Sequence, residues 1–97
     1  MPAYVVSEID VTDAAQYEEY KKLVPATITQ HGGRYLTRGG ATTTLEGGWE
    51  PPRVVLLEFP TVDAARTWYN SPEYAKARAA RAGASVAKIV VVDGIPG

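Results

Sequence analysis

The sequence of 97 residues contains no cysteine, only one histidine and no excess of charge of either sign. Without cysteine there is no disulfide, no thiolate nucleophile and no cysteine-ligated metal. One histidine cannot build a His-rich zinc site, so we expect neither a metal nor a bound cofactor. Ten basic and eleven acidic residues give a net charge of −1. That balance leaves no basic field for a phosphate backbone and argues against nucleic acid as a partner.

Long hydrophobic runs are absent as well. The stretch from Met1 to Glu8 has no basic n-region, and its apolar segment is too short for a signal peptide or a membrane span. We therefore expect no membrane association and a cytoplasmic location. The length predicts a single domain, residues 1–97, with enough chain for one modest core.

What is present is an alternation of strand and helix signals. Runs rich in β-branched and aromatic residues, bounded by glycine, proline or capping residues, predict strands. These predicted strands cover residues 3–9, 34–39, 53–59 and 86–93, with room for a short additional strand over 41–45.

The first helix is predicted between the first two strands. Thr12 offers an N-cap, and apolar residues then recur at spacings of three and four residues as far as Gly32-Gly33. Pro25 has no N–H to donate to the carbonyl of Lys21. We therefore expect the helix to kink or restart at that proline.

The second helical region lies between the last two strands. Thr61 caps it, and Ser71-Pro72 predicts that a separate short helix follows and ends by Gly83. The order is then strand, helix, strand, strand, helix, strand. This order predicts an α+β fold, the ferredoxin-like βαββαβ unit, with an antiparallel four-stranded sheet in the order 4-1-3-2 and helices on one face.

The predicted sheet has an apolar face that these helices cannot cover. Both alternating sets of residues over 54–59 are apolar apart from Glu58, and residues 89–92 form an unbroken apolar run. Because a large exposed apolar face is rare in a monomer, we expect a homodimer that stacks sheet against sheet. The alternative is a monomer whose long glycine-containing loop folds over the second face.

Three segments also carry a family resemblance. They are Gly32 to Gly40, Leu45 to Arg53 with its continuation through Glu58-Phe59-Pro60, and Trp68 to Tyr74. In this order they resemble the domain of unknown function 1330 (DUF1330) family. The resemblance implies a dimeric α+β barrel and no known activity. Relatives in that superfamily include cofactor-independent monooxygenases of aromatic polyketides, lactone isomerases, haem-degrading enzymes and ligand-sensing domains, and the fold does not choose among them.

Glu58 is the candidate catalytic residue. It lies between Leu57 and Phe59, and burying it ionised and unpaired would cost several kcal/mol. It therefore needs an arginine partner, in a structural ion pair, or a raised pKa that would suit proton transfer beside an interior cavity. Glu8 is a weaker candidate of the same kind. We expect strands one and three to run parallel, which would bring the two carboxylates to the same end of the sheet.

Arg38 and Arg53 are candidate ligand-binding residues. They end one strand and begin the next, so they flank the same loop as Trp49. Two guanidinium groups beside an indole suit a planar carboxylate or an enol. The alternative is ordinary ion pairing within the loop, to Glu46 or Glu50.

Two hypotheses of function follow from these residues. In the first, the chain is an enzyme without metal or cofactor that acts on a small organic, aromatic or anionic substrate, as a monooxygenase or an isomerase does. Glu58 would move the proton, Arg38 or Arg53 would orient the anion, and Glu8 and Trp49 would complete the site. In the second, the same residues belong to a non-catalytic ligand-binding or structural dimer. An interior cavity where polar groups converge would favour an enzyme or a ligand-binding protein over a purely structural dimer.

Overall fold

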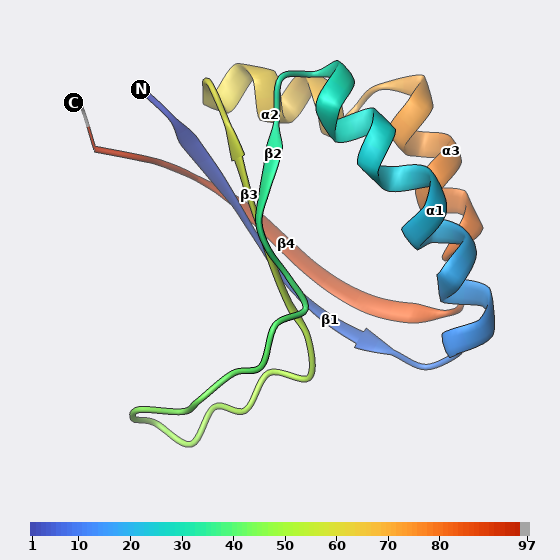
Figure 1. Cartoon of the computed structure of the whole chain (residues 1–97), viewed down its shortest axis with the longest axis vertical. Coiled ribbons are helices and arrows are strands. Elements are labelled where there is room, and N and C mark those ends of the chain that lie inside the picture. The colour runs from blue at the N-terminus through green and yellow to red at the C-terminus, as the bar shows by residue number, and fades with distance from the viewer. Residues whose placement is uncertain (96–97) are drawn as a thin grey trace.

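Strands and helices alternate along residues 1–95, which are the residues that this computed structural model describes (Figure 1). The predicted βαββαβ order is confirmed, with the second helical region divided in two. Residues 41–45 form no strand. The elements are β1 (Ala3–Val11), α1 (Ala14–Gln30), β2 (Arg34–Arg38), β3 (Val54–Phe59), α2 (Val62–Tyr69), α3 (Pro72–Ala80) and β4 (Ser85–Asp93).

The four strands form one sheet in the order β2-β3-β1-β4, the predicted order read in reverse. Every neighbouring pair is antiparallel. The expectation that strands one and three run parallel is therefore wrong. The crossover through α1 makes β1 and β2 run in the same direction, and β3 lies between them and opposes both. Glu8 lies opposite Val54 and Glu58 opposite Tyr4, so the two carboxylates lie at opposite ends of the strand pair.

Helix α1 begins one residue later than predicted and does not break. Its N-cap is Asp13, not Thr12, because the Asp13 carboxylate accepts a hydrogen bond from the backbone N–H of Gln16 (3.1 Å). The helix runs without interruption through Pro25, so the predicted kink or restart there is wrong. It ends where predicted, at a glycine: Gly32 has φ +79°, a left-handed conformation that glycine adopts without steric cost.

Helices α2 and α3 begin at the predicted caps. The Thr61 hydroxyl accepts from the N–H of Ala64 (3.0 Å), and the Ser71 hydroxyl accepts from the N–H of Tyr74 (3.2 Å). Pro72 occupies the first turn of α3, where its missing N–H costs no hydrogen bond. Within residues 1–95, no helix combines the length and the apolar character needed to cross a membrane.

The hydrophobic core lies between the sheet and the helices, which all cover the same face (Figure 1). Alternate residues of the strands point to this side, among them Val5, Ile9, Leu57 and Phe59, and all four are buried. The aromatic and aliphatic side chains that the helices add to this core are Tyr17, Tyr20, Val24, Ile28, Trp68 and Tyr74.

The opposite face of the sheet, called the free face below, is uncovered. Along β4 it presents Val86, Val90 and Val92, which are 62, 56 and 49% exposed. The loop between β2 and β3 does not cover them. Its residues 41–50 are all exposed, and it extends away from the sheet (Figure 1). The alternative in which this loop buries the second face is therefore not what the chain adopts.

Strand β2 contains a β-bulge. Its register against β3 shifts between Tyr35 and Thr37, so that Leu36 is an extra residue in the strand. As a result Arg34 and Arg38 lie on opposite faces, although their spacing of four residues would place them on the same face of a regular strand.

Candidate functional site

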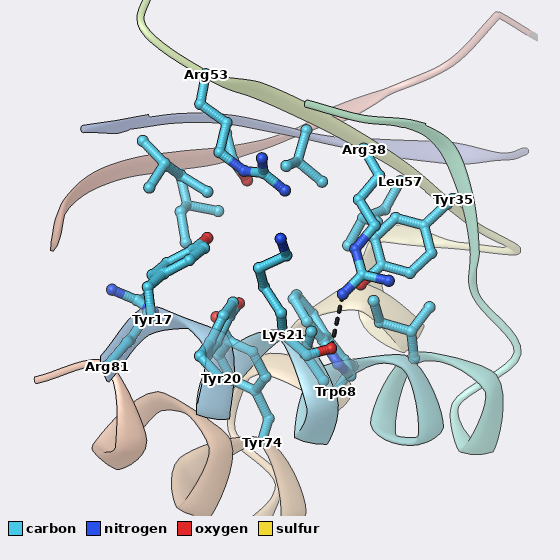
Figure 2. A pocket seen from close by; sticks show the side chains of 16 residues that line it. Tyr17, Tyr20, Lys21, Tyr35, Arg38, Arg53, Leu57, Trp68, Tyr74 and Arg81 are labelled. Atoms are coloured by element: carbon cyan, nitrogen blue, oxygen red, sulfur yellow. Dashed lines mark hydrogen bonds between the residues drawn. The ribbon is translucent and has the colours of Figure 1, made fainter. Parts of the chain in front are cut away.

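A small chamber lies between the sheet and α1, in the interior of the domain (Figure 2). Its volume is about 30 Å³, room for about two water molecules or one charged group of a ligand. Its polar lining is unusual for an interior because it contains four basic side chains and four tyrosines: Lys21, Arg38, Arg53 and Arg81, and Tyr17, Tyr20, Tyr35 and Tyr74.

Arg53 is the residue immediately before β3, and its side chain lines the chamber. Its backbone is fixed because its carbonyl accepts a hydrogen bond from the N–H of Ile9 (2.8 Å). Its guanidinium group lies against the backbone of Gly39, which has φ +74° and leaves no room for a Cβ atom. The Nε–H of Arg53 is buried and has no hydrogen-bond partner within residues 1–95. The ring of Tyr17 lies beside it, 5.8 Å from Cζ to the ring centroid.

Arg38 enters from the end of β2 and binds the backbone of α1. Its Nη2 donates to the carbonyl oxygen of Lys21 (2.7 Å; dashed line in Figure 2). In a regular helix that carbonyl accepts the N–H four residues later, but residue 25 is proline and has none. Arg38 therefore replaces the missing donor, and this bond explains why α1 continues through Pro25. The guanidinium also stacks over Tyr35, 4.9 Å from the ring centroid.

The tyrosines of the chamber are proton donors, not bases. Burial raises the pKa of Tyr17, although the nearby Arg53 and Arg81 partly oppose this. Burial also raises the pKa of Tyr35. The pKa of Tyr20 is raised by its own burial and by the adjacent Tyr74 hydroxyl, which lies 3.0 Å away. All three phenols therefore stay protonated near neutral pH.

The arginines of the chamber lack carboxylate partners. Within residues 1–95, the ion pairs of Arg38 and Arg53 with Glu46 or Glu50 that were the alternative to ligand binding do not form. Lys21, by contrast, pairs with Glu18 at the surface (3.1 Å). The chamber thus carries an excess of positive charge from Arg38, which is exposed, and from Arg53 and Arg81, which are half-buried.

Glu8 and Trp49 do not join this site. The indole Nε1 of Trp49 donates to Oε2 of Glu8 (2.6 Å) on the free face, which ties the long loop to β1. The expected grouping of Trp49 with Arg53 is therefore wrong, because Arg53 points to the helices. Any ligand-binding role of Glu8 and Trp49 would belong to the free face and stays a prediction.

Glu58 is also on the free face. Its side chain is 26% exposed, and its Oε1 accepts a hydrogen bond from Nε of Arg34 (2.8 Å). The predicted arginine partner is present, but Glu58 does not line the chamber, so the expectation that it borders an interior cavity is wrong. The strand parity that buries Leu57 and Phe59 on the helix face turns Glu58 away from it. Its catalytic role stays a prediction.

Sequence reasoning missed two basic residues of the chamber, Lys21 and Arg81. Lys21 lies in α1 and Arg81 caps α3, both next to solvent-facing residues, so the sequence pattern assigns their charges to the solvent-exposed surface. The sequence did contain one indication that residue 21 lies at a contact. Pro25 leaves the Lys21 carbonyl without a helical donor, so a donor from another part of the chain is needed there. Within residues 1–95, no group of three or more histidine or acidic side chains is placed to hold a metal ion.

Comparison with known proteins bears on the fold more than on the chemistry. Residues 2–95 match the sequence model of a family described as "Domain of unknown function (DUF1330)". No functionally curated protein matches the chain. A protein of unknown function from Rhodopseudomonas palustris shares the fold with a TM-score of 0.76 and 18% identity, over 99% of this chain and 84% of its own.

Two further solved structures extend the comparison. SnoaB from Streptomyces nogalater, described as a cofactor-independent oxygenase, has a TM-score of 0.64 at 14% identity over 99% of this chain and 95% of its own. A dimeric ferredoxin-like protein of unknown function from Jannaschia sp. CCS1 has a TM-score of 0.70 at 11% identity, over 97% of this chain and 100% of its own. At such identities these likenesses show the fold alone.

Proposed function

We propose a function for this chain from the premise that it belongs to the DUF1330 family, whose description names no activity. The chamber binds the charged oxygen atoms of a small organic anion, a carboxylate or an enolate, while the rest of the ligand lies outside. One observation carries this proposal: the Nε–H of Arg53 is buried without an acceptor. Such a donor costs about 1–3 kcal/mol, and an anionic oxygen would satisfy it.

The surrounding groups suit negative charge on oxygen. Arg53 and Arg38 bring guanidinium groups from two strands, and Tyr17 adds a neutral hydroxyl whose raised pKa keeps it a donor. Donors that are fixed in advance and aimed at one point stabilise an oxyanion more strongly than water does. The arrangement therefore lowers the free energy of an enolate or carboxylate relative to its protonated form.

A second candidate function is catalysis on that anion without a metal or a cofactor. SnoaB, which has this fold, is described as a cofactor-independent oxygenase, and an enolate is the electron-rich form of a substrate for such chemistry. Within residues 1–95, the lining of the chamber holds no carboxylate or histidine that could act as a base. In this function the chain stabilises the ionised substrate, and water or buffer removes the proton.

The binding proposal is tested with acetate against acetamide, a neutral molecule of nearly the same shape. We expect acetate to shift the NMR signal of the Arg53 Nε–H and acetamide to leave it unchanged. Arg53→Gln should abolish the response of the chamber resonances, and the matched control Arg34→Gln, on the free face, should retain it. Equal effects of the two probes, or a full response in Arg53→Gln, would overturn the proposal.

The two candidate functions are separated with a 1,3-diketone such as acetylacetone. If the chamber stabilises anions, the protein should increase the ultraviolet absorbance of the enolate at pH 7, and Arg53→Gln should not. Oxygen consumption, or exchange of the central C–H that is faster than in buffer alone, would then support catalysis. An absorbance change without either reaction would support the non-catalytic binder.

The free face supports a proposal about assembly. We infer that the chain forms a homodimer in which two free faces stack. The exposed valines of β4 continue into the half-buried Val6 and Leu56 of the two central strands, and the Jannaschia protein with this fold is described as dimeric. The exposed apolar patch is of the kind that marks an interface in soluble proteins.

A further inference from the structure

A groove separate from the chamber runs between α2, α3 and β4. Its volume is about 670 Å³, which is in the range of sites for drug-sized molecules and far larger than the chamber. The ring of Tyr69 forms part of its apolar surface, together with Ile89 and Val91 of β4, and the indole of Trp68 borders the groove while being only 2% exposed. The groove can therefore hold a ring system that the chamber cannot.

The charged residues of the groove are all arginines. Arg66 comes from α2, Arg78 from α3, and Arg81 from the residue that caps α3. Among residues 1–95, no acidic side chain lines the groove. Within residues 1–95, none of the three arginines has a carboxylate at ion-pair distance. An apolar surface rimmed by unpaired positive charge is complementary to an anion with an apolar body.

Arg78 lies against two aromatic rings. Its Cζ lies 4.7 Å from the centroid of the Tyr69 ring and 5.9 Å from that of Tyr74. A guanidinium stacked on aromatic rings loses rotamer freedom before any ligand arrives, and its N–H groups stay in one plane. That geometry favours a planar acceptor such as a carboxylate, which a guanidinium can bind through two parallel hydrogen bonds.

We propose that this groove is a binding site for a planar aromatic carboxylate. The ring would lie against Tyr69, Ile89 and Val91, close to the buried Trp68, and the carboxylate would bind Arg78, with Arg66 beside it. This site stands independently of the chamber, although Trp68 and Arg81 line both, so one layer of side chains separates them.

The test uses 2-naphthoate, its neutral amide 2-naphthamide, and octanoate, an anion without a ring. Trp49→Phe leaves Trp68 as the one tryptophan of the chain, so its fluorescence reports occupancy of the groove, and calorimetry gives the Kd. We expect 2-naphthoate to bind about tenfold or more tightly than 2-naphthamide, the effect of one charged hydrogen bond. Equal affinities, or tighter binding of octanoate than of 2-naphthoate, would overturn the proposed ligand class.

Variants then locate the site. Arg78→Gln should weaken 2-naphthoate about tenfold, whereas Lys76→Gln, an exposed residue of the same helix, and Arg53→Gln in the chamber should each change the Kd less than about twofold. If Arg53→Gln removes binding and Arg78→Gln does not, the ligand occupies the chamber and the groove proposal fails. If circular dichroism shows that Arg78→Gln is unfolded, Arg66→Gln on α2 is used, and no loss of affinity there would also contradict the proposal.

Discussion

The two faces of the sheet differ in how their charges are partnered. On the free face, Glu58 binds Arg34 and Glu8 binds the Trp49 indole, so these two carboxylates have partners within the chain. On the helix face, Arg53 is half-buried, and its buried Nε–H has no acceptor within residues 1–95. Apolar content does not distinguish the faces, because both are rich in valine and leucine. A buried donor without an acceptor does distinguish them, and it lies on the helix side, where we propose that an anion binds.

The largest expected effect on stability comes from substituting one of two adjacent leucines that lie on opposite faces of the sheet. Leu57 is 3% exposed and faces the helices, whereas Leu56 faces the free side. Leu57→Lys places an unpaired charge in the core at a cost of several kcal/mol, a large part of the 5–15 kcal/mol that typically stabilises a domain. We expect it to unfold the chain, as measured by circular dichroism.

Leu56→Lys should have a different outcome. The free face of a single chain is open to water, so the lysine can be solvated and the fold should persist with a change of about 1 kcal/mol or less. Light scattering should show dissociation from about twice 10.4 kDa, the mass of two chains, to the mass of one. A wild-type chain that is monomeric at micromolar concentration would refute the homodimer, and a Leu56→Lys variant that stays dimeric would refute this interface.

The next effect in size concerns the glycine behind Arg53. Gly39→Ala places a Cβ at φ +74°, where it would also collide with the Arg53 guanidinium. We expect a loss of about 1–2 kcal/mol in the free energy of unfolding from the backbone conformation alone. The displaced Arg53 should also lose its acetate response by NMR.

Gly47→Ala is the matched control for that experiment. Gly47 also has a left-handed φ, +86°, but a Cβ there would meet nothing within 4 Å. It should therefore share the loss of stability and keep the acetate response. Equal retention of that response in Gly39→Ala would show that the glycine does not position Arg53.

The helix face should also respond to alkaline pH. The pKa of Tyr20 lies above its ordinary value of 10.0 because burial disfavours the phenolate and Tyr74 adds to the effect. Above pH 10 the folded chain therefore holds a proton that the unfolded chain has lost. This contribution to stability is complete below pH 10 and falls as pH rises further.

Tyr20→Phe removes this titration. Urea unfolding at several pH values should show a shallower loss of stability above pH 10 than in the wild type. At pH 7 the variant should lose about 1 kcal/mol, because the hydrogen bond to Tyr74 is gone. An unchanged slope above pH 10 would mean that Tyr20 ionises without unfolding.

The smallest effect is expected on the free face. Glu58→Gln weakens a partly exposed ion pair with Arg34, and such pairs contribute about 0.2–1 kcal/mol. The acetate response of the chamber should be unchanged, because Glu58 does not line it. If instead the variant folds normally and loses a turnover found for the wild type, Glu58 is the acid or base that the sequence suggested.

The element order and the capping residues were sufficient to predict the fold. Thr61, Ser71-Pro72 and Gly32 act locally, so their effect can be read from neighbouring positions. The direction of β3 relative to β1 is a property of the whole topology, and the assumption about it was wrong. The continuity of α1 at Pro25 was missed for a similar reason, since the compensating donor, Arg38, is 13 positions away in the sequence.

Arg38 and Arg53 line one chamber, and their role in ligand binding stays a prediction. Arg38 and Arg53 flank one loop, and their proximity follows from a hairpin connection between adjacent antiparallel strands. The side to which each strand residue points depends on register, and the bulge at Leu36 changes that register by one. No local pattern announces such a bulge, so the placement of Arg34 and Arg38 on opposite faces could not be derived from the sequence. The face to which Glu58 points is set separately, by the parity of β3 that buries Leu57 and Phe59.

The bond between Arg38 and the Lys21 carbonyl has an evolutionary consequence. Because the proline at position 25 creates the vacancy that the arginine at position 38 fills, the two residues depend on each other. In relatives of this chain, replacement of the proline should remove the need for the arginine, and the two positions should vary together. The same dependence predicts a coupling energy in a double-mutant cycle of Pro25→Ala and Arg38→Gln. The contact between α1 and β2 would then appear in related sequences as covariation between positions 25 and 38, although a proline and an arginine are chemically unlike.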